Sequence, residues 1–311
     1  MNLAEDIETL CIRQLRDWQL ARENYAALDS LLTRELWIGD GLKSRIILQH
    51  NPERIRSTAA DVSDEAIQAR PCFLCDANQP AEQESVLWKS DDGRREYKIQ
   101  VNPYPIFRRH LTISLTKHEP QKCITHDMMP LAQLLPGHVI MFNGKGCGAS
   151  APDHLHFQAT MQQELPLCAE LEARADNSGL DTCYADRNLW MDSGTGRQLI
   201  YIRSNIINSA IVYDMRHALK GLLLNALCWF KNDVWHFVFF PRTQGRPKCY
   251  GTGEGCYLVS PAAAEYGGVW VLPRKQDFDR LTPELVNSFY QELSCKSLEM
   301  KFIYDAYVRV N

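Results

Sequence analysis

The chain has 311 residues, 45% of them hydrophobic, which is enough to bury a full core as one large domain or as two closely packed halves. Its formal charge of -4 excludes the broad basic surface that general nucleic-acid binding requires. No apolar run approaches the roughly 20 residues that span a bilayer. The acidic, amphipathic N-terminus also lacks the pattern of a signal peptide. Eleven scattered cysteines suit reduced thiols, so we expect a cytoplasmic protein with no nucleic-acid and no membrane partner.

Hydrophobic spacing divides the chain into four parts. Apolar residues recur every three or four positions over the first 32 residues, which predicts a helix within an N-terminal helical segment at 1–60. The pattern then changes at 61–171 to short β-rich runs around one helical stretch, HDMMPLAQLL. Residues 172–198 are polar and rich in turn formers, which predicts a connection.

The remaining part, 199–311, repeats the mixture of strands and helices. QLIYIRSNIINSAIVY reads as strand, RHALKGLLLNALCWF as helix, and DVWHFVFFPR and GGVWVLPRK as strands. Thr282 followed by Pro283 is typical of a helix start and predicts a final helix over 283–305. The expected fold class is therefore α+β, a mainly antiparallel sheet with outer helices in two related halves, 61–171 and 199–311.

One short run carries an unusual alternation of polar side chains. In APDHLHFQAT (151–160), His154, His156 and Gln158 occupy every second position, so a strand would present all three on one face. A neutral imidazole is a competent nucleophile toward phosphorus, and an amide can hold a phosphate oxygen by hydrogen bonding. The run taken alone fits a polar strand edge equally well.

The loop before this run is rich in glycine. Its alternating members are Gly144, Lys145, Gly146, Cys147 and Gly148. Glycines allow close approach of the backbone, and successive N–H groups can form an anion-binding nest. The alternative is a hairpin turn that begins at Asn143-Gly144. We favour phosphate binding, because the loop leads directly into the histidine run.

A separate pair, Cys72 and Cys75, has the C-x-x-C spacing of two corners of a zinc site. Two further ligands are needed, and His118 and His154 are candidates. A redox pair or two unliganded thiols are the alternatives, although no thioredoxin-like βαβ unit surrounds the pair.

These motifs together resemble the transferase branch of the histidine-triad superfamily. The branch includes galactose-1-phosphate uridylyltransferases, diadenosine tetraphosphate phosphorylases and GDP-hexose phosphorylases. NPYPIFRRHLTISLTKHEPQ and FNGKGCGASAPDHLHFQAT resemble its turn-and-strand and active-site segments. The branch carries H-x-H-x-Q where hydrolases of the superfamily carry H-x-H-x-H, and Gln158 stands at the third position here. H-L-H-F-Q-A is most similar to the GDP-hexose phosphorylases.

The resemblance implies a histidine-triad-like fold and a role for each residue of the motifs. His156 would be the nucleophile, and Gln158 would bind a phosphate oxygen. The implied catalytic residues are His154, His156 and Gln158. The implied substrate-binding residues are Asn102, Asn143, Gly144, Lys145, Gly146, Gly148 and Ser150. The implied ligands of a structural zinc ion are Cys72, Cys75, His118 and His154, with no organic cofactor.

The sequence departs from the family at two positions next to the nucleophile. A serine that commonly lies five residues before it is Ala151 here, with Ser150 one step earlier, and Asp153 replaces the usual proline or asparagine. Both changes concern details of phosphate binding. The expected function is nucleotidyl transfer, as a phosphorylase of an NDP-sugar of the GDP-hexose type or of a dinucleoside polyphosphate.

Other functions remain open at this point. A sugar-1-phosphate uridylyltransferase, a nucleotide hydrolase and a non-catalytic nucleotide-binding protein would use the same pocket. The expected partners are a nucleotide or nucleotide sugar together with phosphate or a sugar phosphate. Related transferases often dimerise, so a homodimer is also an expectation. The sequence does not identify the base, the sugar or the acceptor.

Overall fold

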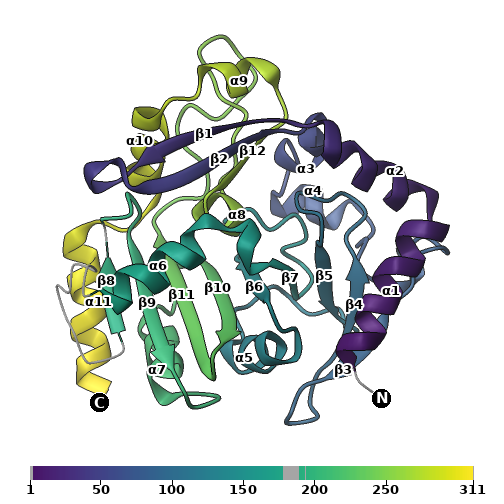
Figure 1. Cartoon of the computed structure of the whole chain (residues 1–311), viewed down its shortest axis with the longest axis horizontal. Helices are drawn as coiled ribbons and strands as arrows, with labels where there is room; N and C mark the ends of the chain where they lie inside the picture. Colours follow the sequence, from purple (N-terminus) through teal and green to yellow (C-terminus); the bar gives the residue numbers. More distant parts are fainter. Residues whose placement is uncertain (1–2, 178–188, 193, 311) are drawn as a thin grey trace.

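The computed structural model describes residues 3–177, 189–192 and 194–310, and these residues form two sheets flanked by helices (Figure 1). The strands are β1 (Leu32–Ile38), β2 (Ser44–His50), β3 (Val86–Lys89), β4 (Glu96–Val101), β5 (Leu111–Leu115), β6 (His138–Asn143), β7 (His156–Met161), β8 (Leu189–Asp192), β9 (Leu199–Ser204), β10 (Leu223–Lys231), β11 (Val234–Arg242) and β12 (Val269–Leu272). The helices are α1 (Leu3–Asp17), α2 (Gln19–Ala27), α3 (Ile55–Thr58), α4 (Asp64–Gln68), α5 (Thr125–Leu134), α6 (Pro166–Asp176), α7 (Ala210–Ala218), α8 (Ala263–Tyr266), α9 (Lys275–Arg280), α10 (Pro283–Leu293) and α11 (Ser297–Val310).

The larger sheet has nine strands in the order β3-β4-β5-β7-β6-β10-β11-β9-β8. Each neighbouring pair in it is antiparallel, which confirms the predicted α+β class with a mainly antiparallel sheet. The pairing of β6 with β10 joins the strands of 61–171 to those of 199–311. We call these two parts of the chain the first half and the second half.

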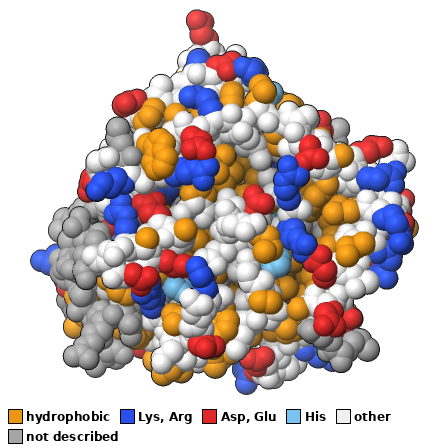
Figure 2. All heavy atoms as spheres, viewed as in Figure 1, with side chains coloured by type: hydrophobic (Ala, Val, Ile, Leu, Met, Phe, Trp, Pro, Cys, Tyr) orange, Lys and Arg blue, Asp and Glu red, His pale blue; other side chains and the backbone are white. Residues whose placement is uncertain are grey.

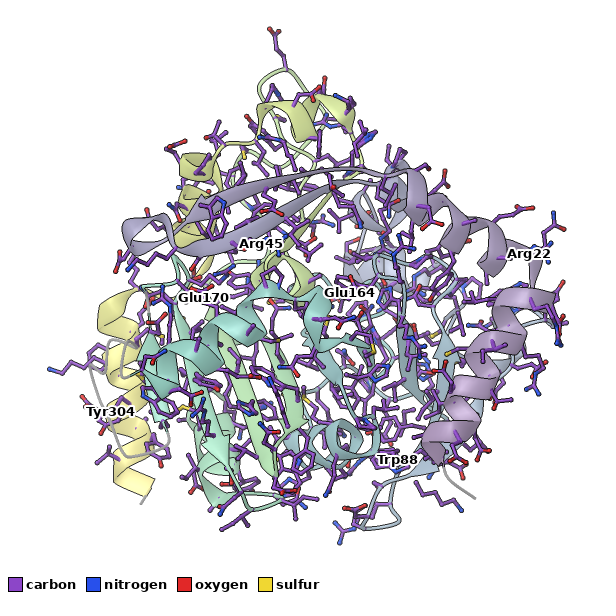
Figure 3. All side chains as sticks on the ribbon, viewed as in Figure 1. Arg22, Arg45, Trp88, Glu164, Glu170 and Tyr304 are labelled. Atoms are coloured by element: carbon purple, nitrogen blue, oxygen red, sulfur yellow. The ribbon has the colours of Figure 1, made fainter. Side chains whose placement is uncertain are left out.

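Two hydrophobic layers enclose the larger sheet. Residues of α5, α7 and α11 pack with one face of its strands, and α6, the smaller sheet and α10 pack with the other. Figure 3 shows the extent of this arrangement, with Trp88 on β3 and Tyr304 on α11 at opposite sides of the molecule. In the same view Arg45 on β2 and Glu170 on α6 mark where the smaller sheet crosses above α6.

The smaller sheet corrects the prediction of an entirely helical segment at 1–60. Helices α1 and α2 end at Ala27, and a hairpin of β1 and β2 follows, with β12 added parallel to β2. Along β2, Ser44, Ile46 and Leu48 are fully buried while Arg45 is exposed. This period of two is typical of a strand. The prediction missed it because the helical spacing of the first 32 residues was extended to the whole of 1–60.

Two assignments in the second half were also wrong. The stretch 216–230, predicted as helix, contains the end of α7 and then β10, and the stretch predicted as one strand from 198 to 213 contains β9 and the start of α7. Strand β10 is buried on both faces between β6 and β11. A strand covered on both sides is a continuous apolar run, and periodicity cannot distinguish it from a buried helix.

The predicted C-terminal helix and the predicted connection differ from the structure in extent. Thr282 caps α10 by accepting a hydrogen bond from the Leu285 N–H at 3.3 Å, as the Thr-Pro signature indicates. The helix ends at Leu293, and α11 follows as a separate helix. Within 172–198, α6 extends to Asp176 and β8 belongs to the larger sheet, while 178–188 and 193 lie outside the described residues.

Candidate active site and metal centre

Strand β7 places His156 and Gln158 on one face, as the sequence predicts, whereas His154 precedes the strand and is not part of this row. His156 lies opposite Ser114 of β5, and Gln158 lies opposite Thr112. Phe157 points to the other face and is fully buried in the layer under α5. His156 and Gln158 therefore lie together on the side of the sheet that faces α6 and the smaller sheet.

The hydrogen bonds of His156 define its tautomer. Its Nδ1 lies 2.8 Å from the backbone carbonyl of His154, so Nδ1 carries the proton and donates to that oxygen. Burial lowers the pKa of His156 to about 4, so the ring is neutral at pH 7. Nε2 consequently has a free lone pair, which is the form a nucleophile requires.

Gln158 is oriented by a residue to which the sequence analysis assigned no role. The Ile106 N–H donates to His110 Nδ1 at 3.2 Å, so the other ring nitrogen, Nε2, carries the proton and donates to Gln158 Oε1 at 3.2 Å. Burial, reinforced by the charge of Arg54, lowers the pKa of His110 to about 3 and keeps it neutral. The Gln158 carbonyl is thereby engaged, and its NH₂ group is left to donate to a bound anion.

The amide of Gln121 joins the strands on either side of the glycine loop (144–150). Its Nε2 donates to the carbonyls of Asn143 and His156, both at 2.9 Å, and its Oε1 accepts the His156 N–H at 2.9 Å. No local pattern predicts this contact, because Gln121 lies 35 residues from His156 in an irregular segment.

The glycine loop packs against the second half as well as leading into β7. The Gly144 N–H donates to the Leu224 carbonyl at 3.0 Å, and a Cβ atom on Gly144 would lie 2.6 Å from that oxygen. A Cβ on Gly148 would overlap the Cβ of Ala262, and Gly148 also has a φ of +86°. Glycine is therefore required at both positions by close packing, a reason that the phosphate interpretation did not include.

The remaining predicted substrate residues have these neighbours. Asn102 is used within its own turn, accepting from the Tyr104 N–H at 2.9 Å and donating to Thr112 Oγ1 at 3.1 Å. Lys145 is exposed and pairs with Asp64 at 2.6 Å. Gly146, Gly148 and Ser150 line a cavity of about 200 Å³ together with Ser57, Val62, Ala149, Gly245, Arg246 and Ser260.

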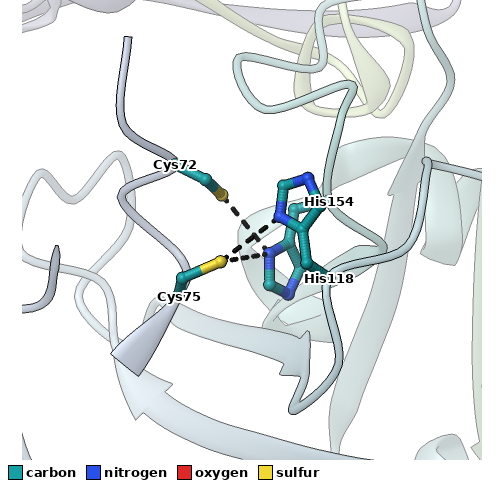
Figure 4. A group of neighbouring side chains, drawn as sticks. All are labelled: Cys72, Cys75, His118 and His154. Atoms are coloured by element: carbon teal, nitrogen blue, oxygen red, sulfur yellow. Dashed lines mark hydrogen bonds between the residues drawn. The ribbon is translucent and has the colours of Figure 1, made fainter. Parts of the chain in front are cut away.

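The four predicted metal ligands converge (Figure 4). The ligand atoms of Cys72, Cys75, His118 and His154 all lie within 4.8 Å of one another. Sγ of Cys72 is 3.3 Å from Nδ1 of His154, and Sγ of Cys75 is 3.3 Å from Nδ1 of His118 and 3.6 Å from Nδ1 of His154. Tetrahedral zinc with ordinary Zn–S and Zn–N bonds separates sulfur from nitrogen by roughly 3.6 Å. The cluster can therefore hold a metal ion such as zinc.

The surroundings of the cluster suit a bound cation. His154 Nε2 donates to the Leu115 carbonyl at 2.7 Å, which leaves the Nδ1 lone pair directed at the two sulfurs. Asp153 lies 3.9 Å from His118 Nε2 and accepts a hydrogen bond from Arg70 at 3.0 Å. Asp153, one of the two departures from the family pattern, thus borders the ligand set, and Arg70 also links it to the Ser150 carbonyl of the glycine loop.

One buried histidine outside the site leads to a prediction on stability. His236 on β11 stacks on Trp229 at 4.8 Å, its Nδ1 lies 2.6 Å from the Tyr201 hydroxyl, and burial lowers its pKa to about 4. In the unfolded chain His236 takes up a proton near pH 6.5, whereas in the folded chain it stays neutral down to about pH 4. The free energy of unfolding therefore falls as the pH is lowered from 6.5 toward 4. In urea unfolding, His236→Gln should reduce this slope by up to about 1.4 kcal/mol per pH unit. An unchanged slope would contradict the assignment.

Charges of both signs are spread over the face shown in Figure 2, with several Lys and Arg side chains gathered at its right edge. No helix within the described ranges is both long enough and apolar enough to cross a membrane.

Comparison with known proteins identifies a matching family over part of the chain and solved structures with a similar fold. Residues 10–161 match a family described as "Domain of unknown function (DUF4922)". No curated protein sequence matches the chain significantly. Among solved structures, yeast Ap4A phosphorylase Apa2 is similar, with a TM-score of 0.57 and 14% identity over 89% of this chain and 93% of that chain.

Two further structures of the same yeast protein are also similar. Its complex with Ap4A has a TM-score of 0.57 and 13% identity, over 89% of this chain and 96% of that one. Its complex with AMP has a TM-score of 0.53 and 14% identity, over 90% and 96%. The chain therefore has the fold of a yeast Ap4A phosphorylase over nearly its whole length.

Proposed function

We propose that this protein is a nucleotide phosphorylase that works through a nucleotidyl-histidine formed on His156. The observation that carries the proposal is the free Nε2 lone pair of a neutral, buried His156, set by the bond from Nδ1 to the His154 carbonyl. The fold of the yeast Ap4A phosphorylase supports the same class of reaction. The donor is an NDP-sugar of the GDP-hexose type or a dinucleoside polyphosphate.

The first half-reaction transfers a nucleoside monophosphate to the protein. Nε2 of His156 attacks the α-phosphorus, a P–N bond forms, and the P–O bond to the rest of the donor breaks with its electrons on the departing phosphate. The ring becomes positively charged, which strengthens the hydrogen bond from Nδ1 to the His154 carbonyl. The NH₂ group of Gln158, freed by its bond to His110, donates to a non-bridging phosphate oxygen.

The second half-reaction returns the histidine to its neutral form. An oxygen of inorganic phosphate attacks the same phosphorus, and the P–N bond breaks with its electrons on Nε2. The product is a nucleoside diphosphate. Gln158 cannot act as a general acid or base, so it does not activate water as an ionisable group would. This favours transfer to phosphate over hydrolysis.

We also propose that Cys72, Cys75, His118 and His154 hold a structural zinc ion. Bound zinc would cross-link the segment around residue 72 to the ends of β5 and β7. His154 contributes its side chain to this cluster and its carbonyl to His156, so the cluster fixes the acceptor that determines the nucleophile's tautomer.

The two halves are proposed to be related units. Each contains two strands, a helix and two strands, β4-β5-α5-β6-β7 and β8-β9-α7-β10-β11, and their sheet orders mirror each other across the pair β6–β10. His236 on β11 lies opposite Arg203 of β9, as His156 on β7 lies opposite Ser114 of β5. Two residues further on, β11 has Val238 where β7 has Gln158. The polar row is therefore confined to the first half.

A panel of donors tests the function. Ap4A, GDP-glucose, UDP-glucose and ADP-glucose are incubated with the protein with and without inorganic phosphate, and the products are identified by mass. We expect a nucleoside diphosphate only when phosphate is present, from at least one donor. Release of nucleoside monophosphate without phosphate would indicate a hydrolase instead, and binding without turnover of any donor would indicate a non-catalytic protein.

A further inference from the structure

The second half reaches the glycine loop through two buried polar side chains. Asn225 on β10 donates from Nδ2 to the Asn143 side-chain oxygen and to the Cys147 carbonyl, both at 2.8 Å. Asn225 is fully buried, so these bonds are shielded from water. The Ala263 N–H, also from the second half, donates to the same oxygen of Asn143 at 2.8 Å.

Arg242, the last residue of β11, holds Asn225 in place. Its side chain is only 1% exposed, and it donates to Asn225 Oδ1 at 2.8 Å, to the Pro261 carbonyl at 2.6 Å and to the Gly245 carbonyl at 2.6 Å. All three acceptors are neutral, and within the described ranges no carboxylate forms an ion pair with this guanidinium. A buried cation without a counter-ion is costly, so its retention calls for an explanation.

The contacts continue from Arg242 to the nucleophile. Asn225 bonds the side chain of Asn143, the residue just before the glycine loop, and the carbonyl of Cys147 in the middle of the loop. Gln121 then joins the Asn143 carbonyl to the backbone of His156. Each link is a hydrogen bond of 2.8 or 2.9 Å between buried or half-buried groups.

We propose that Arg242 is a positioning residue for the reaction at His156, acting through Asn225 on the glycine loop and the start of β7. The inference rests on the proposed function and adds a role for the second half, whose buried histidine, His236, lies in a separate cluster. Arg242 acts indirectly, because its hydrogen bonds go to Asn225, Pro261 and Gly245 and not to His156. It keeps the loop at the distance from His156 that in-line attack requires.

The fork of the guanidinium explains why arginine occupies this position. One nitrogen, Nη1, bonds Asn225 and Pro261, while Nη2 bonds Gly245. A lysine ammonium keeps the charge but is a single point on a flexible stem, so it cannot reproduce this planar set of contacts. Arg242→Lys therefore separates a geometric role from a purely electrostatic one.

The test compares Arg242→Lys with Arg197→Lys as a matched control. Arg197 is also 1% exposed, donates a hydrogen bond to the Thr195 carbonyl and lies over the ring of Tyr290. Among the described residues it makes no hydrogen bond to the glycine loop. The readout is the single-turnover rate at which a donor labelled at the α-phosphorus, Ap4A or GDP-glucose, labels His156. Rates are taken at saturating donor and normalised to the folded fraction from circular dichroism.

We expect Arg242→Lys and Asn225→Ala each to lower this rate about 10- to 100-fold with little change in donor affinity, and Arg197→Lys to stay within about 2-fold of the wild type. The double variant should be no slower than the slower single variant, because the two side chains act in series. Equal rates in Arg242→Lys and Arg197→Lys, or additive losses in the double variant, would overturn the positioning role. A wild type that is never labelled would instead overturn the proposed function.

Discussion

Replacing His156 with alanine is expected to abolish nucleotidyl transfer, lowering the turnover rate by about a thousand-fold or more, because no other group can form the covalent intermediate. The wild type should gain the mass of one nucleoside monophosphate when it is mixed with donor in the absence of phosphate. Peptide mapping by mass spectrometry should place that mass on His156, and His156→Ala should gain none.

His236→Asn provides the matched control for this prediction. His236 is buried on the corresponding strand of the second half and lies opposite a residue of β9 as His156 lies opposite one of β5. Its Nδ1 is engaged with the Tyr201 hydroxyl. The variant should be labelled as the wild type is. Full activity of His156→Ala, or loss of the label only in His236→Asn, would show that the assigned nucleophile is wrong.

Removal of the metal should have the second large effect. Cys75→Ser is expected to lose a bound zinc ion and to lower the melting temperature by about 10 °C, because a structural zinc site contributes several kcal/mol to the free energy of folding. Elemental analysis of protein purified without added metal measures the zinc, and scanning calorimetry measures the melting temperature. We expect close to one zinc per chain in the wild type.

A cysteine outside the cluster controls for the loss of a thiol in general. Cys256 is half-buried, and Cys256→Ser should keep both the zinc content and the melting temperature of the wild type. Wild-type protein that contains no zinc would contradict the metal assignment. Zinc retained at full occupancy by Cys75→Ser would show that this cysteine is not a ligand.

The chemistry of the site was more predictable from the sequence than its supports. His156 and Gln158 share a face because a strand has a period of two, and the metal candidates were found because C-x-x-C spacing and histidine are chemically distinctive. The four candidate metal ligands come from three segments; the C-x-x-C spacing indicated two of them, and the resemblance to the histidine-triad superfamily matched all four in type and order. The structure brings their ligand atoms within 4.8 Å of one another.

The supports could not be predicted, because they depend on distances across the fold. Nothing in the local sequence distinguishes Gln121 and Asn225 from polar residues that are exposed on the surface. Strand β10, which carries Asn225, was taken for a helix because both of its faces are apolar. Only the pairing of β6 with β10 places Asn225 opposite Asn143, and long-range pairing leaves no periodic trace in one sequence.

The glycines of the loop limit both the relative motion of the two halves and the substitutions that this contact tolerates. Where Gly146 meets Gly245 the two backbones touch directly, and a Cβ atom on Gly245 would overlap the Gly146 carbonyl. A contact of bare main chain has no side-chain layer that could repack to accommodate a tilt or a new residue. The two halves are therefore in direct main-chain contact at this point, and we expect a larger residue at Gly245 to displace the glycine loop relative to the start of β7.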